Sequence, residues 1–120
     1  MNCIFCSIVN GDISCHKVYE DENILAFLDV NPVSLGHTLI IPKEHTLDVT
    51  TISNDILLDI LDKSKDVGKL LMDKMGAKGF TLTQNNGITQ EVKHFHLHVI
   101  PKYSKKVNMT IEEVHKKLTN

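Results

Sequence analysis

The chain has 120 residues, enough for one domain with its own hydrophobic core. Hydrophobic residues make up 42% and charged residues 23%, as in ordinary globular proteins, and no apolar run approaches the ~20 residues that cross a membrane. A formal net charge of −2 excludes binding to nucleic acids or membranes that depends on bulk positive charge. We therefore expect a single domain over residues 1–120, with no nucleic acid and no membrane among its partners.

The first residues and the cysteine count indicate a cytoplasmic protein. Met1–Cys6 lack the basic start and the apolar core of a signal peptide. The three cysteines are Cys3, Cys6 and Cys15, and an odd number argues against a framework of disulfides. We therefore expect the cysteines to be free thiols or metal ligands.

The first part of the chain predicts a short helix and three strands. Ile4–Val9 favours a helical turn, which Asn10-Gly11 ends. Three β-rich runs follow; the turn Asp21-Glu22-Asn23 separates the first two, and Asn31-Pro32 precedes the third. These runs are Lys17–Glu20, Ile24–Leu28 and His37–Ile41.

Residues 53–76 carry the clearest helical pattern. Ser53 or Asn54 can cap this helix, and Gly76 marks its end. The apolar side chains recur at helical spacing and form one stripe: Leu57, Ile60, Leu61, Val67, Leu71 and Met75. Beyond it we expect two strands and a last short helix, at Phe80–Thr83, His94–Ile100 and Ile111–Leu118.

The order of these elements predicts an α+β fold. Short connections between strands favour antiparallel pairing. We expect an antiparallel β-sheet of about five strands, with one long helix packed on it and short helices at both termini. In the last strand Phe95, Leu97 and Val99 face the helix, which leaves the other face open to a ligand.

That other face carries the most informative pattern in the chain, His94-Phe95-His96-Leu97-His98. Side chains alternate along a strand, so the three imidazoles share one face. Imidazole transfers protons, attacks phosphorus and binds metals near neutral pH. The triplet alone is consistent with nucleophilic catalysis, with a catalytic zinc site or with a solvated row of polar side chains.

The surrounding sequence narrows these alternatives. Gln90–Pro101 closely resembles the signature of the histidine-triad (HIT) family, and three more segments resemble that family in order and approximate spacing. They are Cys3–Val9, Ile24–Pro32 and Gly36–His45. On this resemblance the chain is identified as a member of the family over nearly all of residues 3–103.

The resemblance implies a nucleotide hydrolase with the HIT-like fold. His96 would attack the α-phosphorus of a purine nucleotide and form a covalent nucleotidyl-histidine, and His98 would contact the phosphate and help the leaving group depart. Asp29 would accept hydrogen bonds from the ribose hydroxyls. The other substrate-binding positions that the resemblance implies are Ile4, Phe5, Ile8, Phe27, Val30, His37, Asn85 and Gln90. The apolar ones would enclose the purine, with packing in the core as the alternative.

The chain contains no arginine, because all thirteen basic residues are lysines. Arginine is the usual bidentate clamp for phosphate, so backbone N–H groups, His, Asn or Lys must bind any phosphate here. Phosphoryl-type transfer needs mainly positioning and charge stabilisation, which N–H groups and imidazoles can supply.

Cys3 and Cys6 have the spacing of metal ligands, although a redox pair or two structural thiols are alternatives. A tetrahedral zinc site needs two more nitrogen or sulfur ligands. The chain is similar to a bacterial branch of the HIT family, in which these cysteines would bind a structural Zn2+ together with His45 and His94. His94 would then serve the metal, whereas His96 serves the reaction.

One position departs from the family's pattern. Glu91 replaces the Ser or Thr that usually follows Gln90, and a carboxylate opposes an anionic substrate. Either Glu91 points away from the site, or the leaving-group side of the site differs, and we then expect the hydrolysis of adenosine phosphoramidates to be slower. The resemblance leaves two classes of substrate possible, purine nucleoside phosphoramidates and dinucleoside polyphosphates.

Family members are commonly homodimers, and the helix over residues 53–76 with the strand near Phe80 could supply such an interface. The alternative to an enzyme is a protein that binds a purine nucleotide or a protein partner with little turnover, because a fold does not fix a function.

Overall fold

The computed structural model describes residues 3–120, so Met1 and Asn2 of the expected domain lie outside the described residues. Within them the strands form one five-stranded sheet in the order β1-β2-β3-β5-β4, with every neighbouring pair antiparallel. The strands are β1 (Lys17–Glu20), β2 (Ile24–Leu28), β3 (Thr38–Pro42), β4 (Gly79–Gln84) and β5 (Leu97–Lys102). This arrangement confirms the predicted α+β fold.

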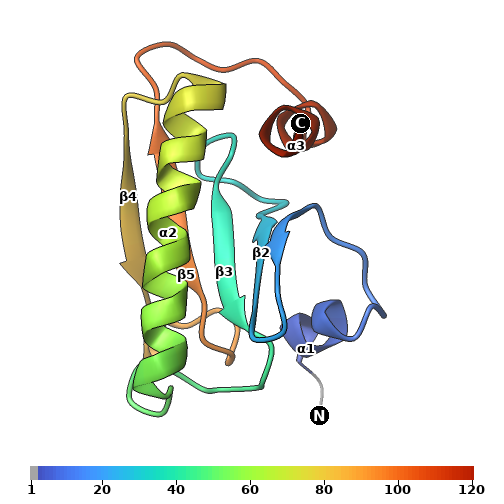
Figure 1. Cartoon of the computed structure of the whole chain (residues 1–120), viewed down its shortest axis with the longest axis vertical. Coiled ribbons are helices and arrows are strands. Elements are labelled where there is room, and N and C mark those ends of the chain that lie inside the picture. Colours follow the sequence, from blue (N-terminus) through green and yellow to red (C-terminus); the bar gives the residue numbers. More distant parts are fainter. Residues whose placement is uncertain (1–2) are drawn as a thin grey trace.

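Helix α2 (Asn54–Met75) covers one face of the sheet, as predicted (Figure 1). The Ser53 side chain caps it by accepting a hydrogen bond from the Ile56 N–H, and Gly76 ends it with a φ of 71°. The helix buries most of its predicted apolar stripe against alternate residues of the strands, but Leu61 of that stripe is exposed. This main core includes Ile24, Ile40, Ile60, Val67, Leu71, Phe95, Leu97 and Val99.

The opposite face is partly covered by helix α1 (Ile4–Val9). Its buried residues Phe5 and Ile8 pack against alternate residues of β2 and β3 in a second, smaller core. The strand residues of this core are Leu25, Phe27, Leu39 and Ile41. Because β2 and β3 are buried on both faces, β2 is apolar throughout and β3 is apolar after Thr38.

Two further helical segments complete the fold. Helix α3 (Ile111–Thr119) closes the main core with Val114 and Leu118. A short 3₁₀ helix, η1 (Gly87–Thr89), follows β4. Among the helices of residues 3–120, none is long and apolar enough to cross a membrane.

The histidine strand begins later than the sequence pattern predicts. We expected a strand over His94–Ile100, whereas β5 covers Leu97–Lys102 and contains only His98 of the triplet. The residues before β5 leave the sheet because the Phe95 N–H donates to the carbonyl oxygen of Thr46, in the loop after β3, at 2.7 Å.

The prediction that the histidine face is open to a ligand is also wrong for the first two imidazoles. His94 and His96 are 0% and 4% exposed, and only His98 keeps intermediate exposure. The cause is α1, whose Phe5 ring packs edge-on against both buried rings. His94 is therefore closed off from solvent, whereas His98 remains partly accessible.

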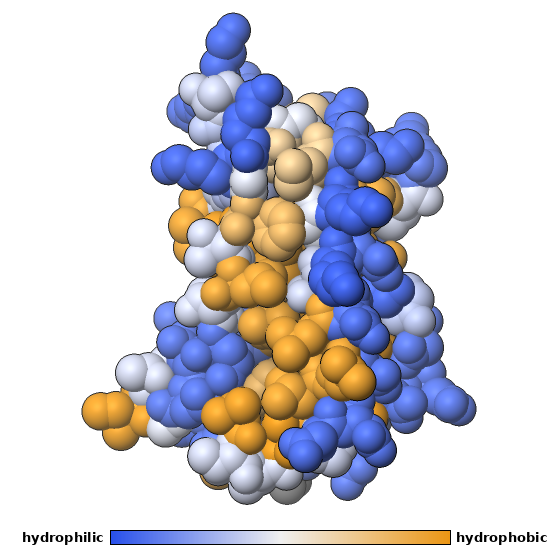
Figure 2. Space-filling view, turned by 60° about the vertical axis from the view of Figure 1, so that its left-hand side comes forward, coloured by the Kyte–Doolittle hydropathy of each residue, from blue (hydrophilic) through white to orange (hydrophobic). Residues whose placement is uncertain are grey.

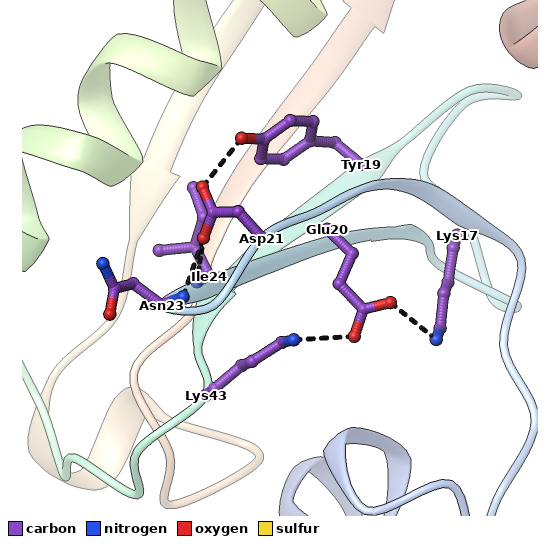
Figure 3. A network of polar contacts seen from close by, with 7 residues as sticks. All are labelled: Lys17, Tyr19, Glu20, Asp21, Asn23, Ile24 and Lys43. Atoms are coloured by element: carbon purple, nitrogen blue, oxygen red, sulfur yellow. Dashed lines mark hydrogen bonds and ion pairs between the residues drawn. The ribbon is translucent and has the colours of Figure 1, made fainter.

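The predicted turn between β1 and β2 is held by the carboxylate of Asp21 (Figure 3). It accepts hydrogen bonds from the N–H groups of Asn23 and Ile24, at 2.8 and 2.9 Å. Beside this turn, Glu20 forms an ion pair of 2.7 Å with Lys43, which follows β3 directly. The network thus fixes the start of the segment that leads from β3 to the functional site.

Gly68→Ala tests the packing of α2 on β4. A Cβ at position 68 would lie 2.2–2.6 Å from ring atoms of Phe80, so the ring would have to leave its place over the helix. We expect the free energy of unfolding to fall by about 1–3 kcal/mol, although alanine is the better helix former. Urea unfolding followed by circular dichroism measures the change. Gly79→Ala, where a Cβ meets nothing within 4 Å, is the control, and equal losses in both variants would contradict this account.

Candidate functional site

The predicted metal ligands lie together where α1, the loop after β3 and the segment before β5 meet. Ligand atoms of Cys3, Cys6, His45 and His94 all lie within 4.8 Å of one another. His94 Nδ1 lies 3.4 Å from Cys3 Sγ and 3.6 Å from Cys6 Sγ, and His45 Nδ1 lies 3.2 Å from Cys6 Sγ. Sulfur and nitrogen ligands of a tetrahedral zinc are about 3.6 Å apart. The cluster therefore fits a structural zinc site.

The protonation of His94 also suits a zinc ligand. Its Nε2 lies 2.8 Å from the carbonyl oxygen of Pro42, and a carbonyl only accepts, so Nε2 carries the proton. Nδ1 keeps its lone pair and faces the thiols. Such a hydrogen bond from the other ring nitrogen is the usual support of a metal-bound histidine. Burial lowers the pKa of His94, which keeps the ring neutral, as a ligand must be.

A cavity of about 150 Å³ lies beside His96 and brings five of the predicted site residues together. They are Asp29, His37, Asn85, His96 and His98. Asp29 follows β2, His37 precedes β3 and Asn85 follows β4. Because the strand order is β2-β3-β5-β4, the cavity runs across the sheet from the Asp29 side to the Asn85 side.

His96 presents an unprotonated nitrogen in a fixed direction. Its Nδ1 lies 2.7 Å from the carbonyl oxygen of His94, so the neutral ring carries its proton there and Nε2 keeps the lone pair. Phe5 packs against the ring with the centroids 5.1 Å apart. The direction of this nitrogen is therefore set by the backbone of a predicted metal ligand.

His37 and His98 form a chain with defined proton positions. The Val33 N–H donates to His37 Nδ1 at 3.1 Å, so the proton of His37 sits on Nε2. That N–H donates to His98 Nδ1 at 2.9 Å, which leaves the proton of His98 on its Nε2. Asp29 Oδ2 lies 3.8 Å from His37 Nε2 and faces the same proton. His98 can thus donate an N–H to a ligand in the cavity.

Both of these rings are neutral at neutral pH. Burial, with the neighbouring His96 and His37 adding to it, lowers the pKa of His98 to about 4. Burial also lowers the pKa of His37, against the opposing effect of Asp29. Neither ring therefore brings a fixed positive charge to the cavity.

Asp29, His37 and His98 also have possible ligand atoms within 4.8 Å of one another, but they do not suit a metal. His37 Nδ1 already accepts the Val33 N–H. If Nε2 bound a metal as well, the ring would have to be a fully deprotonated imidazolate. A metal at the triad itself, one of the alternatives left open by the triplet, is thus disfavoured by the hydrogen bonds.

The predicted purine-binding residues divide into two sets. Phe5, Ile8 and Phe27 are buried in the smaller core, in agreement with the core-packing alternative. Ile4 and Val30 are 51% and 70% exposed, so their apolar surface is available to a ligand.

Gln90 is not among the residues that line the cavity. Its side chain is buried, and Nε2 donates to the carbonyl oxygen of Leu47 at 2.7 Å. Its buried Oε1 has no partner within residues 3–120. In the structure Gln90 thus links the segment before β5 to the loop after β3 through this hydrogen bond.

The cavity also contains residues that sequence reasoning did not assign to the site. Asn31, Val33 and Glu91 line it. The pair Asn31-Pro32 was read only as a break between strands, and no side-chain pattern could mark the backbone N–H of Val33. Glu91 was noticed as a departure from the family's pattern, and it lines the cavity.

Known proteins share this sequence and architecture. The HIT domain model matches residues 10–105. The chain is 46% identical over 104 residues to the adenosine 5'-monophosphoramidase of Schizosaccharomyces pombe, with 85% of this chain and 75% of that protein covered. It is 42% identical over 106 residues to the Bacillus subtilis protein named Protein hit, with 87% and 73% covered.

A solved structure extends this likeness to three dimensions. The zinc-bound histidine triad family protein from Mycobacterium smegmatis superposes with a TM-score of 0.92 at 34% identity, and the match covers 99% of this chain and 91% of that one. The chain therefore belongs to the HIT family, and its Cys/His cluster is suited to a structural zinc.

Cys6→Ser tests the metal site. We expect the wild-type chain to bind about one zinc, and the variant to lose it, with a Tm lower by roughly 5–10 °C, because the metal holds α1 to the rest of the fold. Elemental analysis and thermal unfolding measure both effects. Cys15→Ser removes a thiol outside the cluster and should change neither. A Cys6→Ser protein with a full complement of zinc would contradict the assignment.

Proposed function

We propose that this protein hydrolyses purine nucleotides at the α-phosphate, with nucleoside phosphoramidates or dinucleoside polyphosphates as substrates. The observation that carries the proposal is the hydrogen bond from His96 Nδ1–H to the carbonyl oxygen of His94, which leaves an unprotonated Nε2 at a residue that lines the cavity. The relative named as an adenosine 5'-monophosphoramidase supports the same chemistry.

In the first step of the proposed reaction the lone pair of His96 Nε2 attacks the α-phosphorus. An N–P bond forms, the bond from phosphorus to the leaving group breaks, and the leaving atom keeps the electron pair. That atom takes a proton from solvent water, while the His98 Nε2–H donates a hydrogen bond to it. In the second step water attacks the phosphorus and gives up a proton to the solvent, the N–P bond breaks with its electron pair returning to His96 Nε2, and the nucleoside monophosphate leaves.

The nucleoside would lie at the Asp29 side of the cavity. One carboxylate oxygen of Asp29 accepts a backbone N–H at 2.9 Å, which orients the group for ribose hydroxyls. Exposed apolar surface for the purine comes from Ile4 and Val30. Since the chain has no arginine, the phosphate would be bound by the His98 N–H, by Asn85 and by backbone N–H groups.

A covalent adduct tests this proposal. After rapid mixing with an adenosine phosphoramidate, intact-mass spectrometry should detect adenylate on the wild-type chain and peptide mapping should place it on His96. His96→Ala should form no adduct and lose about 10³-fold or more in kcat, because the nucleophile is gone.

His16→Gln, which changes a histidine outside the cavity, is the control and should retain both the adduct and turnover. If wild type binds adenosine monophosphate but forms no adduct and turns nothing over, the alternative of a nucleotide-binding protein is correct.

The proposal also includes a homodimer built on α2 and β4. Figure 2 shows an apolar area on this side of the molecule, and its exposed side chains on the two elements are Leu58, Leu61, Met72 and Leu82. β4 is the end strand of the sheet, so its outer edge has no strand partner among residues 3–120. An antiparallel edge is self-complementary, and a second copy can pair with it about a two-fold axis.

Leu82→Glu tests the dimer. A carboxylate within the apolar area would be desolvated on association, so we expect the variant to be monomeric where the wild type has the mass of two chains. Light scattering after size-exclusion chromatography measures the mass. Ile13→Glu places the same charge at an exposed apolar residue between α1 and β1 and should leave the dimer intact. A monomeric wild type would contradict this part of the proposal.

A further inference from the structure

Glu91 lines the catalytic cavity, but the proposed reaction gives it no role. It lies between η1 and β5, three residues before His94, and it is exposed. None of the ion pairs among residues 3–120 includes its carboxylate. A negatively charged residue without an ion-pair partner among the described residues therefore lines the site.

The position of Glu91 relates it to the leaving group. Asp29 reaches the cavity from the end of β2, whereas Glu91 comes from the connection between β4 and β5, which also carries Asn85. The strands β2 and β4 lie on opposite sides of β5, which carries His98. With the nucleoside at Asp29, the group that departs from phosphorus points toward the Asn85 and Glu91 side.

The residues that line the cavity bring negative charge to it and no lysine. The cavity contains the two carboxylates Asp29 and Glu91, three imidazoles and two amide side chains, and no lysine is among the described residues that line it. The fixed hydrogen bonds of His37 and His98 leave these rings uncharged. An anionic leaving group would meet repulsion from Glu91, weakened by the surrounding solvent, and a cationic one would meet attraction.

We infer that Glu91 is a specificity-determining residue that selects phosphoramidates whose amine leaving group carries a second, positively charged group on a short arm. This inference rests on the proposed hydrolysis and names its substrate class. The reaction keeps the same balance: the P–N bond breaks, the amine nitrogen keeps the electron pair and takes a proton from solvent water beside the His98 N–H, and the distant ammonium stays unchanged. Leaving groups that end in phosphate or carboxylate are disfavoured by the same charge.

Three adenosine phosphoramidates with arms of equal length, ending in ammonium, hydroxyl or carboxylate, test this inference. For wild type we expect kcat/KM to fall roughly tenfold at each step in that order, as a carboxylate about 5 Å from the arm's end would produce. Glu91→Gln should bring the three substrates within about threefold of one another. Added salt should compress the wild-type order, which a merely structural role of Glu91 would not cause.

Glu112→Gln is the matched control, because it removes the same charge from an exposed position on α3 and should preserve the order. Equal kcat/KM for the ammonium and hydroxyl substrates in wild type, or an unchanged order in Glu91→Gln, would overturn the inference.

Binding of the same three compounds to His96→Ala, measured by calorimetry, separates the two proposals. If affinities follow the charge order but wild type turns nothing over, the hydrolase proposal fails and charge selection by Glu91 stands. If turnover occurs but neither affinity nor kcat/KM follows the charge of the arm, charge selection fails and the hydrolase proposal stands.

Discussion

The hydrogen bond from His96 Nδ1–H to the carbonyl oxygen of His94 is the interaction on which the site depends. His94 uses each of its polar groups for a different purpose: ring Nδ1 faces the thiols, ring Nε2–H donates to Pro42, and the backbone carbonyl orients His96. When bound, zinc joins α1 to the two segments that carry His45 and His94. Such a crosslink stiffens the backbone that aims the reacting nitrogen, without any part in bond breaking.

Local patterns were sufficient to predict most of the fold. Helix α2 begins and ends within one residue of the predicted range 53–76, because the Ser53 cap and the left-handed Gly76 are encoded where they act. The antiparallel sheet followed from alternation and short connections. The start of β5 could not be predicted in the same way, since it depends on a hydrogen bond between Phe95 and Thr46, which are distant in the sequence.

The residue types of the site could be predicted, but not their protons or their exposure. No pattern in the triplet shows that Phe5 of α1 folds over it and buries two of its imidazoles. The proton position of His37 is set by the backbone N–H of Val33, a group that every residue except proline supplies. Together these constraints give a site in which neutral imidazoles and N–H groups replace arginine, and in which a single carboxylate, Glu91, acquires unusual influence.

The most direct test of this account is the protonation of the histidine rings in the zinc-loaded protein, measured by nitrogen-15 NMR at neutral pH. The account predicts a proton on Nδ1 of His96, with the proton on Nε2 in both His94 and His98. Removal of zinc should increase exchange broadening at His96, because the carbonyl that holds its proton is then less constrained. A proton on Nε2 of His96 in the zinc-loaded protein would contradict the account, since the ring would then have no lone pair to attack phosphorus from that nitrogen.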